Sequence, residues 1–235
     1  MRFYTNHHYT DAREKDAREN TKEPSRTAVL NFLLASFDRT TDYLEIGVRN
    51  PDSNFNHIIA GTKHSVDPGV EFEENPVDFK LTSDVFFEAV RSGKILSKDV
   101  KFDVIFVDGL HLAEQVDRDI QNALDFIAND GFVVLHDCNP PTEWHARTTY
   151  EYHLTPARRS WNGTTWKAFQ KWRYNPDVYS CCIDTDFGVG VLAKTRKIGI
   201  SIQKTNDFYE YSRLEKTRVE SLNLTSFEDF KRRLV

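Results

Sequence analysis

The chain has 235 residues, of which 39% are hydrophobic and 13% aromatic, and this composition suits one α/β domain with a sizeable core. Its 31 basic residues are interspersed with 36 acidic ones, for a formal net charge of -5, so no basic stripe fits a phosphate backbone and we expect no nucleic-acid partner. No apolar run approaches the roughly 20 residues that span a bilayer, and the first ten residues lack the pattern of a secretory signal, so we expect no membrane insertion and a cytoplasmic location.

Strands and helices are predicted to alternate along the chain. Residues 11–26 are mostly charged with no apolar face, which indicates a solvated helix or lead-in, and residues 27–37 have the spacing of an amphipathic helix. Buried strands are then expected at 43–48, 64–67, 78–81, 102–109 and 131–137, with helices near 54–60 and at 83–93 and 111–130. This alternation, with right-handed crossovers, predicts a doubly wound, mostly parallel sheet.

Acidic side chains follow two of the predicted strands. Asp108 ends the fourth strand, and His136 and Asp137 follow the fifth. Ligands of doubly wound sheets bind at the carboxyl ends of the strands, and neighbouring strands lie about 4.8 Å apart. We therefore expect the two carboxylates to share one ligand or ion, although a single Asp in such a place can also cap the following turn.

The first strand-to-helix turn favours a cofactor that contains ribose. Glu45 and Gly47 lie at this turn, and Asp67 ends the next strand about 20 residues on, where a carboxylate can bind ribose hydroxyls. The turn has a single glycine and carries Arg49 and Asn50, so it lacks the Gly-x-Gly-x-x-Gly pattern that brings a backbone close to a pyrophosphate. S-adenosylmethionine fits these constraints, and NAD fits them badly.

Five short motifs resemble those of the class I S-adenosylmethionine-dependent methyltransferases, over roughly residues 41–194. The resemblance is nearest to a branch that accompanies glycosyltransferases and sugar-modifying pathways. The motifs are LEIGV at 44–48, VDPG at 66–69, TSDVFF at 82–87, FVDGLH at 106–111 and LHDCNPP at 135–141. The resemblance implies a Rossmann-like methyltransferase fold, with a seven-stranded, mostly parallel sheet and an antiparallel C-terminal strand pair within residues 178–194.

The chain is predicted to form one unit with two loosely attached ends. Residues 1–26 would be an N-terminal lead-in, residues 27–200 the S-adenosylmethionine-dependent methyltransferase domain, and residues 201–235 a C-terminal helical extension. Residues 161–172 resemble the loop and helix that cover the acceptor pocket in this fold.

Cofactor contacts are assigned by the same motifs. Glu45 and Gly47 would line the methionine end of S-adenosylmethionine, and Asp67 would hold its ribose. Ser83 and Asp84 would face the adenine, and residues 108–111 would close the floor beneath the transferred methyl group. The full predicted cofactor-binding set is Glu45, Gly47, Arg49, Asn50, Asp67, Ser83, Asp84, Asp108, Gly109 and His111.

A divalent cation, Mg²⁺ or Mn²⁺, is the second predicted cofactor. In the metal-dependent sugar and catechol O-methyltransferases that the chain resembles, acids after the fourth and fifth strands hold Mg²⁺, which positions the acceptor oxygens and lowers a hydroxyl pKa. The corresponding ligands here are Asp108, His136 and Asp137. His136 stands where the sugar enzymes have another acid, and Cys138 where the catechol enzymes have an amide. Because hard ions prefer oxygen ligands, metal-dependent and metal-independent reactions both stay open.

The predicted function is methyl transfer to a hydroxyl, most simply of a sugar or glycan, so a small-molecule or glycan acceptor is the expected partner. The predicted catalytic residues are His111 and His136 as candidate bases, with Asp108 and Asp137 beside them, and His145 is a third candidate base. Two other classes stay open: an NAD(P)-dependent oxidoreductase on a similar fold, and a non-catalytic binding domain of a glycan-assembly protein. A homo-oligomer is compatible with the sequence.

Overall fold

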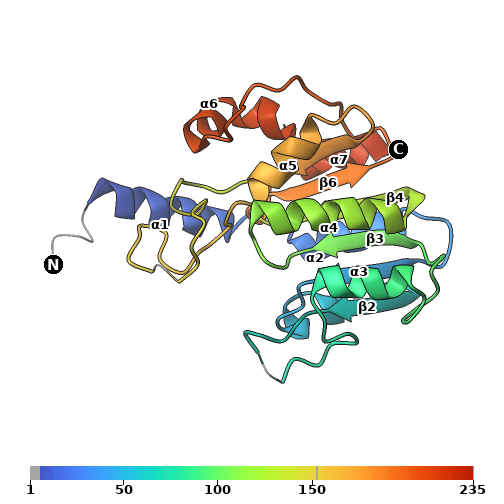
Figure 1. Cartoon of the computed structure of the whole chain (residues 1–235). Helices are drawn as coiled ribbons and strands as arrows, with labels where there is room; N and C mark the ends of the chain where they lie inside the picture. The colour runs from blue at the N-terminus through green and yellow to red at the C-terminus, as the bar shows by residue number, and fades with distance from the viewer. Residues whose placement is uncertain (1–5, 73, 152, 235) are drawn as a thin grey trace.

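A seven-stranded sheet with the order β2-β1-β3-β4-β6-β5-β7 organises the chain (Figure 1). The structure is a computed structural model that describes residues 6–72, 74–151 and 153–234. The strands are β1 (Asp42–Ile46), β2 (Thr62–Val66), β3 (Phe102–Val107), β4 (Ile127–Leu135), β5 (Tyr179–Ile183), β6 (Val189–Ala193) and β7 (Leu224–Thr225). Strand β6 runs antiparallel to both of its neighbours, β4 and β5, and the other pairs are parallel. The predicted α/β class and the antiparallel pair within residues 178–194 are therefore confirmed.

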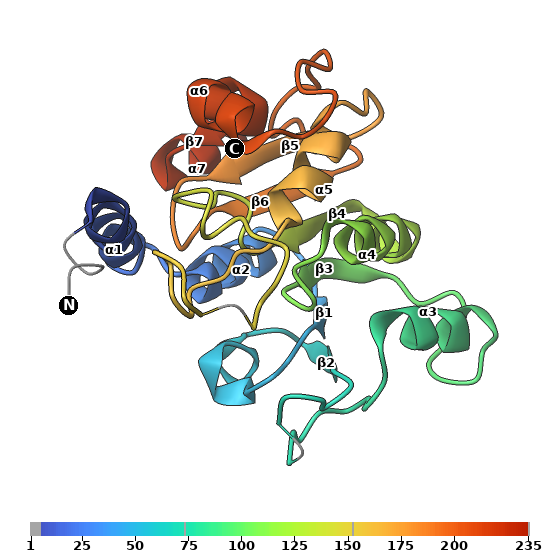
Figure 2. The same cartoon turned by 60° about the vertical axis from the view of Figure 1, so that its left-hand side comes forward.

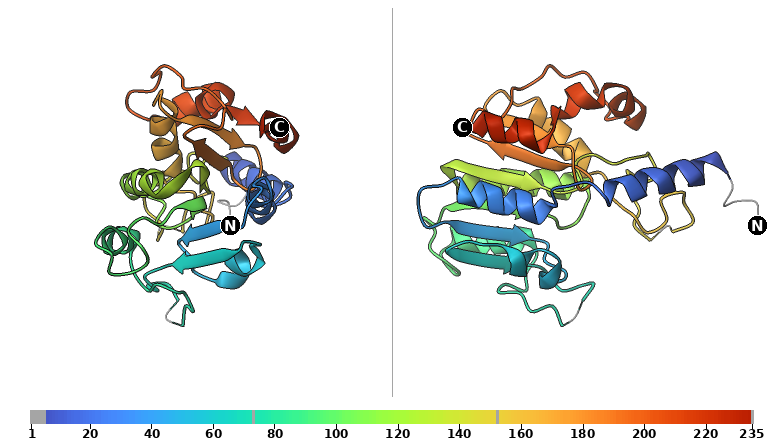
Figure 3. Two further views of the ribbon diagram at one scale, coloured as in Figure 1. Left: turned by 90° about the vertical axis from the view of Figure 1, so that its right-hand side faces the viewer. Right: turned by 180° about the vertical axis from the view of Figure 1, so that it is seen from behind.

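Helices cover both faces of this sheet (Figure 3). They are α1 (His7–Glu19), α2 (Arg26–Ala35), α3 (Ser83–Arg91), α4 (Ala113–Phe126), α5 (Thr165–Arg173), α6 (Tyr211–Leu222) and α7 (Phe227–Leu234). Helices α3, α4, α5 and α6 pack against one face, and α2 and α7 pack against the other. Within the described ranges, no helix combines the length and the apolar character needed to cross a membrane.

Strand β3 is the centre of the core, and every one of its residues is buried. Ile105 and Val107 pack toward α3 and α4, whereas Val104 and Phe106 pack toward α2. This alternation explains the apolar run of residues 104–107, because a parallel strand covered on both faces has no solvent-facing side. Each such side chain stabilises the fold by about 1.5–3 kcal/mol through burial.

The strand predicted at residues 78–81 is wrong, and the sheet has an additional strand near the C-terminus instead. Residues 78–81 form only an isolated bridge, between Phe79 and Val66. The carboxylate of Asp78 accepts hydrogen bonds at 2.8 Å from both the backbone N–H and the hydroxyl of Ser65, so local side-chain bonds replace the strand ladder. Strand β7, within the predicted C-terminal helical extension, pairs with β5 as the seventh strand.

The helix predicted at residues 111–130 ends early, at Phe126. Ile127 already pairs with Phe102 of β3, and a register shift in this pairing accommodates the next residues of β4. The polar residues that were predicted to end the helix therefore belong to an irregular start of the strand.

The helix predicted near residues 54–60 is also wrong. Two 3₁₀ turns, η2 (Pro51–Ser53) and η3 (Phe55–His57), occupy this part of the chain. The side chain of Asn50 accepts a hydrogen bond from the N–H of Asp52 at 3.0 Å, which favours a tight turn over an α-helix.

The predicted lead-in is attached to the turn between β5 and β6. Residues 1–5 of it lie outside the described residues. Lys22, between α1 and α2, binds Glu19 at 2.7 Å and Asp184 at 2.6 Å. Helix α1 thereby lies beside the long loop that follows β4, beyond the carboxyl end of that strand (Figure 2). Its Asp16 contacts His145 of that loop.

Gly47 lies where the turn after β1 closely approaches the residues that follow β3. It has a φ of 92°, and a Cβ at this position would lie 2.3 Å from the carbonyl oxygen of Asp108. We expect Gly47→Ala to lower the free energy of unfolding by at least about 2 kcal/mol more than Gly93→Ala does. Gly93 is the matched control, since its φ is 69° and an added Cβ would meet nothing within 4 Å. Urea unfolding measures both variants, and equal losses would contradict a steric constraint between the two strands.

Candidate functional site

A cleft of about 310 Å³ lies at the carboxyl ends of β1, β3 and β4. This is the place where doubly wound sheets bind ligands. The predicted site residues that line it are Glu45, Gly47, Arg49, Asn50, Asp108, Gly109, His111, His136 and Asp137. The structure therefore brings the predicted catalytic groups together with the turn that follows β1.

Three predicted cofactor contacts are not among the residues that line this cleft. Asp67 is half-buried after β2, where its Oδ1 accepts a 2.6 Å hydrogen bond from the N–H of Gly69. Ser83 and Asp84 begin α3, and both accept hydrogen bonds from the Gln115 side chain of α4, at 3.1 and 3.3 Å. These bonds stabilise a turn and a contact between helices. The roles in ribose and adenine binding stay predictions.

Asp137 has an unusual backbone conformation directly after β4. Its φ is 61°, in the left-handed region, which costs roughly 1–3 kcal/mol for a residue with a side chain. The N–H groups of Cys138 and Asn139 donate to the carbonyl oxygens of Gly188 and Phe187, at 3.0 and 2.8 Å. The turn between β5 and β6 thereby holds the strained segment in place and fixes Asp137 in the cleft.

Two carboxylates and two imidazoles meet at the floor of the cleft, and a third carboxylate, that of Asp186, contacts one of these imidazoles. The Nε2 of His111 lies 3.2 Å from Oδ1 of Asp108, and its Nδ1 lies 3.1 Å from Oδ2 of Asp137. The Nδ1 of His136 lies 3.2 Å from the same Asp108 oxygen, and its Nε2 lies 3.1 Å from Oδ1 of Asp186. Every ring nitrogen of the two histidines therefore faces a carboxylate.

Arg26 is the third cation of this cluster, and no sequence pattern indicated it or Asp186. Its guanidinium lies 3.3 Å from Oδ2 of Asp186 and 3.8 Å from Oδ2 of Asp108. Its backbone N–H also donates to Asp186 at 2.9 Å, across 160 positions of sequence. The N-cap Ser25 fixes the start of α2 and hence the position of Arg26. Only the fold brings these residues together, because no local pattern connects them.

Neighbouring charges shift the pKa values of the cluster. Burial would lower the pKa of His111, but the charge of Asp137 and the hydrogen bond to Asp108 raise it to about 9. Burial is likewise outweighed at His136, where the charges of Asp137 and Asp108 raise the pKa well above its usual value. The pKa of Asp108 is lowered in spite of burial, chiefly by the charge of His136. Two protonated imidazoles and Arg26 together match the charge of the three carboxylates.

One divalent cation would balance the same carboxylates. Oxygens of Asp108 and Asp137 and a nitrogen of His111 lie within 4.8 Å of one another, so one ion could bind all three. The predicted ligand set had His136 in place of His111. His136 contacts both acids, but its Nε2 is bound to Asp186. Two carboxylates with one imidazole suit Mn²⁺ or Mg²⁺, and binding would displace protons from the histidines.

Glu45 is a buried acid beside this cluster. Its Oε2 accepts hydrogen bonds from the hydroxyl of Tyr43 at 2.6 Å and from Nδ2 of Asn54 at 2.9 Å. Burial raises the pKa of Glu45 to about 7, although both hydrogen bonds act in the opposite direction. A group with this pKa is poised to change its charge when a cation enters the cleft.

Tyr150, Arg159 and Trp161 close one side of the cleft, as the resemblance implied in part. The ring of Trp161 stacks on His111, with a centroid distance of 5.2 Å, and Tyr150 lies 5.2 Å from Trp161. Asn162 donates a 2.6 Å hydrogen bond to Oδ1 of Asp137, which leaves Oδ2 facing His111. The contribution of Asn162 was missed, since a single Asn in a loop carries no signal of its own.

His145, the third candidate base, lies outside the cleft. It is fully buried, its Nδ1 lies 2.8 Å from the hydroxyl of Thr142, and its Nε2 lies 3.4 Å from Asp16. These partners give His145 a structural role between the loop and α1.

The fold and the cleft define an α/β enzyme whose ligand binds at the carboxyl ends of parallel strands. The chain belongs to the family described as "Methyltransferase domain", whose model matches residues 2–138 and thus more than half of the chain. It is therefore a class I, S-adenosylmethionine-dependent methyltransferase, which decides against the oxidoreductase and the non-catalytic domain. The match ends directly after Asp137 and includes Glu45, Gly47 and Asp108.

Solved structures similar to this chain include three methyltransferases. The O-methyltransferase TomG from Streptomyces achromogenes is 13% identical, with 81% of this chain and 90% of that chain covered and a TM-score of 0.48. The O-methyltransferase from Bacillus cereus is 13% identical, with 79% and 88% covered and a TM-score of 0.43. The Podospora anserina methyltransferase PaMTH1 is 16% identical, with 80% and 86% covered and a TM-score of 0.48. No curated protein matches the sequence.

The raised pKa of Glu45 makes the stability of the fold depend on pH. The folded pKa of about 7 exceeds the unfolded value of 4.5, so the contribution of Glu45 is fully present below pH 4.5 and is lost as the pH rises through 7. We expect the stability of Glu45→Gln relative to the wild type to increase by about 3 kcal/mol between pH 4.5 and pH 8. Denaturant unfolding at several pH values measures this difference. A difference that stays constant over this range would show that Glu45 is charged throughout.

Proposed function

We propose that this methyltransferase transfers the methyl group of S-adenosylmethionine to a hydroxyl of a sugar or glycan, with a divalent cation at the acceptor. The observation that carries the proposal is the convergence of Asp108, His111 and Asp137 beside the turn at Gly47. The sulfonium of the cofactor supplies an activated methyl group. The protein therefore has to align this group with the acceptor oxygen and assist the loss of one proton.

The cleft has suitable partners for the methionine end of the cofactor. The Nε of Arg26 is buried and has no hydrogen-bond partner within the described part of the chain, so a carboxylate could accept from it. Glu45 is the nearby acid that an ammonium group would favour in its charged form. Asp67 would bind the ribose hydroxyls from the end of β2.

Asp108, Asp137 and His111 would hold the cation. When bound, the cation supplies a positive charge that orients the acceptor oxygens and lowers the pKa of the hydroxyl. His136 would keep Asp108 in position, because its other nitrogen is tied to Asp186. Both histidines are predicted as bases, but each of their ring nitrogens faces a protein carboxylate. The position of His111 between Asp108 and Asp137 favours a ligand role. The bond between His136 and Asp186 favours a positioning role for His136.

Aromatic side chains support a sugar as the acceptor. Tyr150 and Trp161 both line the cleft, on the side where Trp161 covers His111. The apolar C–H face of a sugar ring packs well against such rings, while its hydroxyls reach polar groups at the floor. A cytoplasmic location and a homo-oligomeric state stay predictions.

Removal of divalent ions tests the proposed mechanism. We expect chelator to abolish methyl transfer to a panel of sugars and sugar derivatives, and added Mg²⁺ or Mn²⁺ to restore it. The turnover of Asp137→Asn should fall at least about 10²-fold and should not recover with added ion, because this variant lacks one of the two carboxylates. Formation of S-adenosylhomocysteine measures the rate.

The matched control is Asp99→Asn, an exposed acid between α3 and β3 that does not line the cleft. It should respond to chelator and to added ion as the wild type does. Full activity of the wild type in chelator would contradict a cation at the acceptor. The acids would then only orient His111, which would have to act as the base.

A further inference from the structure

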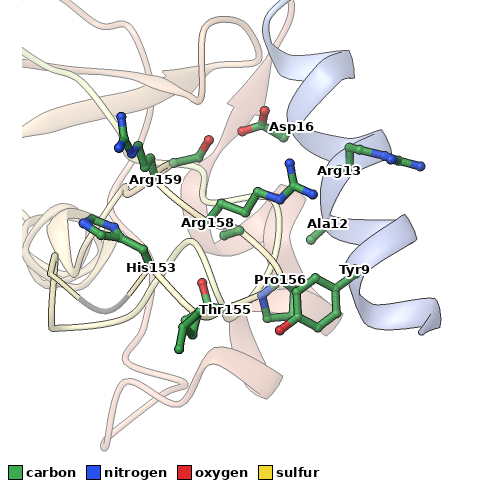
Figure 4. A pocket seen from close by; sticks show the side chains of 12 residues that line it. Tyr9, Ala12, Arg13, Asp16, His153, Thr155, Pro156, Arg158 and Arg159 are labelled. Carbon is green, nitrogen blue, oxygen red and sulfur yellow. The ribbon is translucent and has the colours of Figure 1, made fainter. Parts of the chain in front are cut away.

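A second cavity, of about 870 Å³, lies between α1 and the segment of residues 153–160 (Figure 4). Tyr9, Ala12, Arg13 and Asp16 line it from α1, where their spacing puts them on one face of the helix. The opposite wall belongs to the segment of residues 153–160. None of the predicted site residues lines this cavity, so it is a separate feature of the fold.

Arginine side chains give the lining an excess of positive charge. Arg13, Arg158 and Arg159 line the cavity, together with a single carboxylate, Asp16. Figure 4 shows Arg158 extending from its loop toward α1. Asp16 already binds Nε2 of His145 at 3.4 Å, and this hydrogen bond lowers its pKa. Arg13 and Arg159 then leave the lining with a net positive charge, which a bound anion would balance.

A buried hydroxyl in the same lining has no partner. Thr155 is 2% exposed, and its Oγ1 forms no hydrogen bond within the described residues. An unmet buried hydroxyl destabilises the fold, and a ligand oxygen would remove this cost. Guanidinium groups next to a free hydroxyl donor are the kind of partners that phosphate and carboxylate oxygens take.

The cavity adjoins the cleft of the catalytic cluster. Arg159 lines both of them. Two positions later Trp161 stacks on His111, and the next residue, Asn162, donates to Asp137. One ligand could therefore place a group in the cavity and a hydroxyl beside the cluster.

We propose that this cavity binds an anionic group of the acceptor, a phosphate or a carboxylate. The inference rests on the proposed methyl transfer to a sugar hydroxyl, and it narrows the acceptor to a sugar phosphate or a sugar acid. Arg158 and Arg159 donate to the oxygens of the anion, and Thr155 adds a hydrogen bond from its hydroxyl. Tyr9 and Pro156 provide apolar surface for the rest of the ligand.

Calorimetric titration of the full chain with glucose 1-phosphate, glucuronate and glucose tests this proposal. We expect one of the two charged sugars to bind at least about tenfold more tightly than glucose, with an affinity that falls as salt is added. Preference for glucose 1-phosphate identifies a phosphate site, and preference for glucuronate identifies a carboxylate site. Arg158→Gln and Arg159→Gln should each weaken binding about tenfold. The matched control is Arg18→Gln, an exposed arginine of α1 that does not line the cavity.

Thr155→Val provides a second test that keeps the shape of the side chain. Without ligand, its melting temperature should equal or exceed that of the wild type, because an unmet hydroxyl is removed. Glucose 1-phosphate or glucuronate, whichever binds more tightly, should raise this melting temperature less than it raises that of the wild type. The proposal is overturned if glucose binds as tightly as the charged sugars, or if both arginine variants bind them as the wild type does. These measurements report binding and not turnover. If the wild type transfers methyl groups to sugars but shows no preference for the charged sugars, this inference fails and the proposed function stands.

Discussion

Three largely buried carboxylates, Asp108, Asp137 and Asp186, impose the charge constraint that the rest of the site satisfies. Their oxygens face His111, His136 and Arg26 at distances between 3.1 and 3.8 Å. A buried charge without a partner costs several kcal/mol, so such a cluster is stable only when opposite charges match it. Arg26 is permanently charged and supplies one of them. The other two come from two imidazolium protons or from one divalent cation, and this choice connects the fold to the proposed reaction.

The same constraint explains how distant segments are held together. Asp108 follows β3, Asp137 follows β4, and Asp186 lies in the turn between β5 and β6, while Arg26 begins α2. The turn that carries Asp186 also holds the strained backbone of the segment after β4. Lys22 ties α1 to the same turn through Asp184, and α1 forms one wall of the second cavity. The electrostatic cluster and the proposed anion pocket therefore depend on the same attachment of the N-terminal segment.

Much of the fold could be predicted from the sequence, because its signals are local. The apolar run of β3 at residues 104–107 results from burial on two faces, and the helical spacing of α4 results from burial on one face. The predicted strand at 78–81 failed for a local reason as well, since Asp78 bonds to Ser65 through its side chain. A propensity for extended structure does not reveal such a competing side-chain bond.

Only those residues of the candidate site could be predicted whose positions follow from the order of the strands along the chain. Asp108 and Asp137 follow adjacent parallel strands, so their proximity follows from the alternation of strands and helices. Arg26 and Asp186 could not be found in this way, because 160 positions separate them and only the folded chain brings them into contact. The choice of His111 over His136 as a possible ligand likewise depends on which nitrogen Asp186 occupies.

The proton balance of cation binding tests the central claim most directly. Calorimetric titration of the protein with Mn²⁺ near pH 7, in buffers of different ionisation enthalpy, gives the number of protons that each bound ion releases. The account predicts a release that approaches two protons, one from His111 and one from His136, and about one proton in His136→Asn. Binding of Mn²⁺ without proton release would contradict the claim that imidazolium charges and a divalent cation are alternative ways of balancing the three carboxylates.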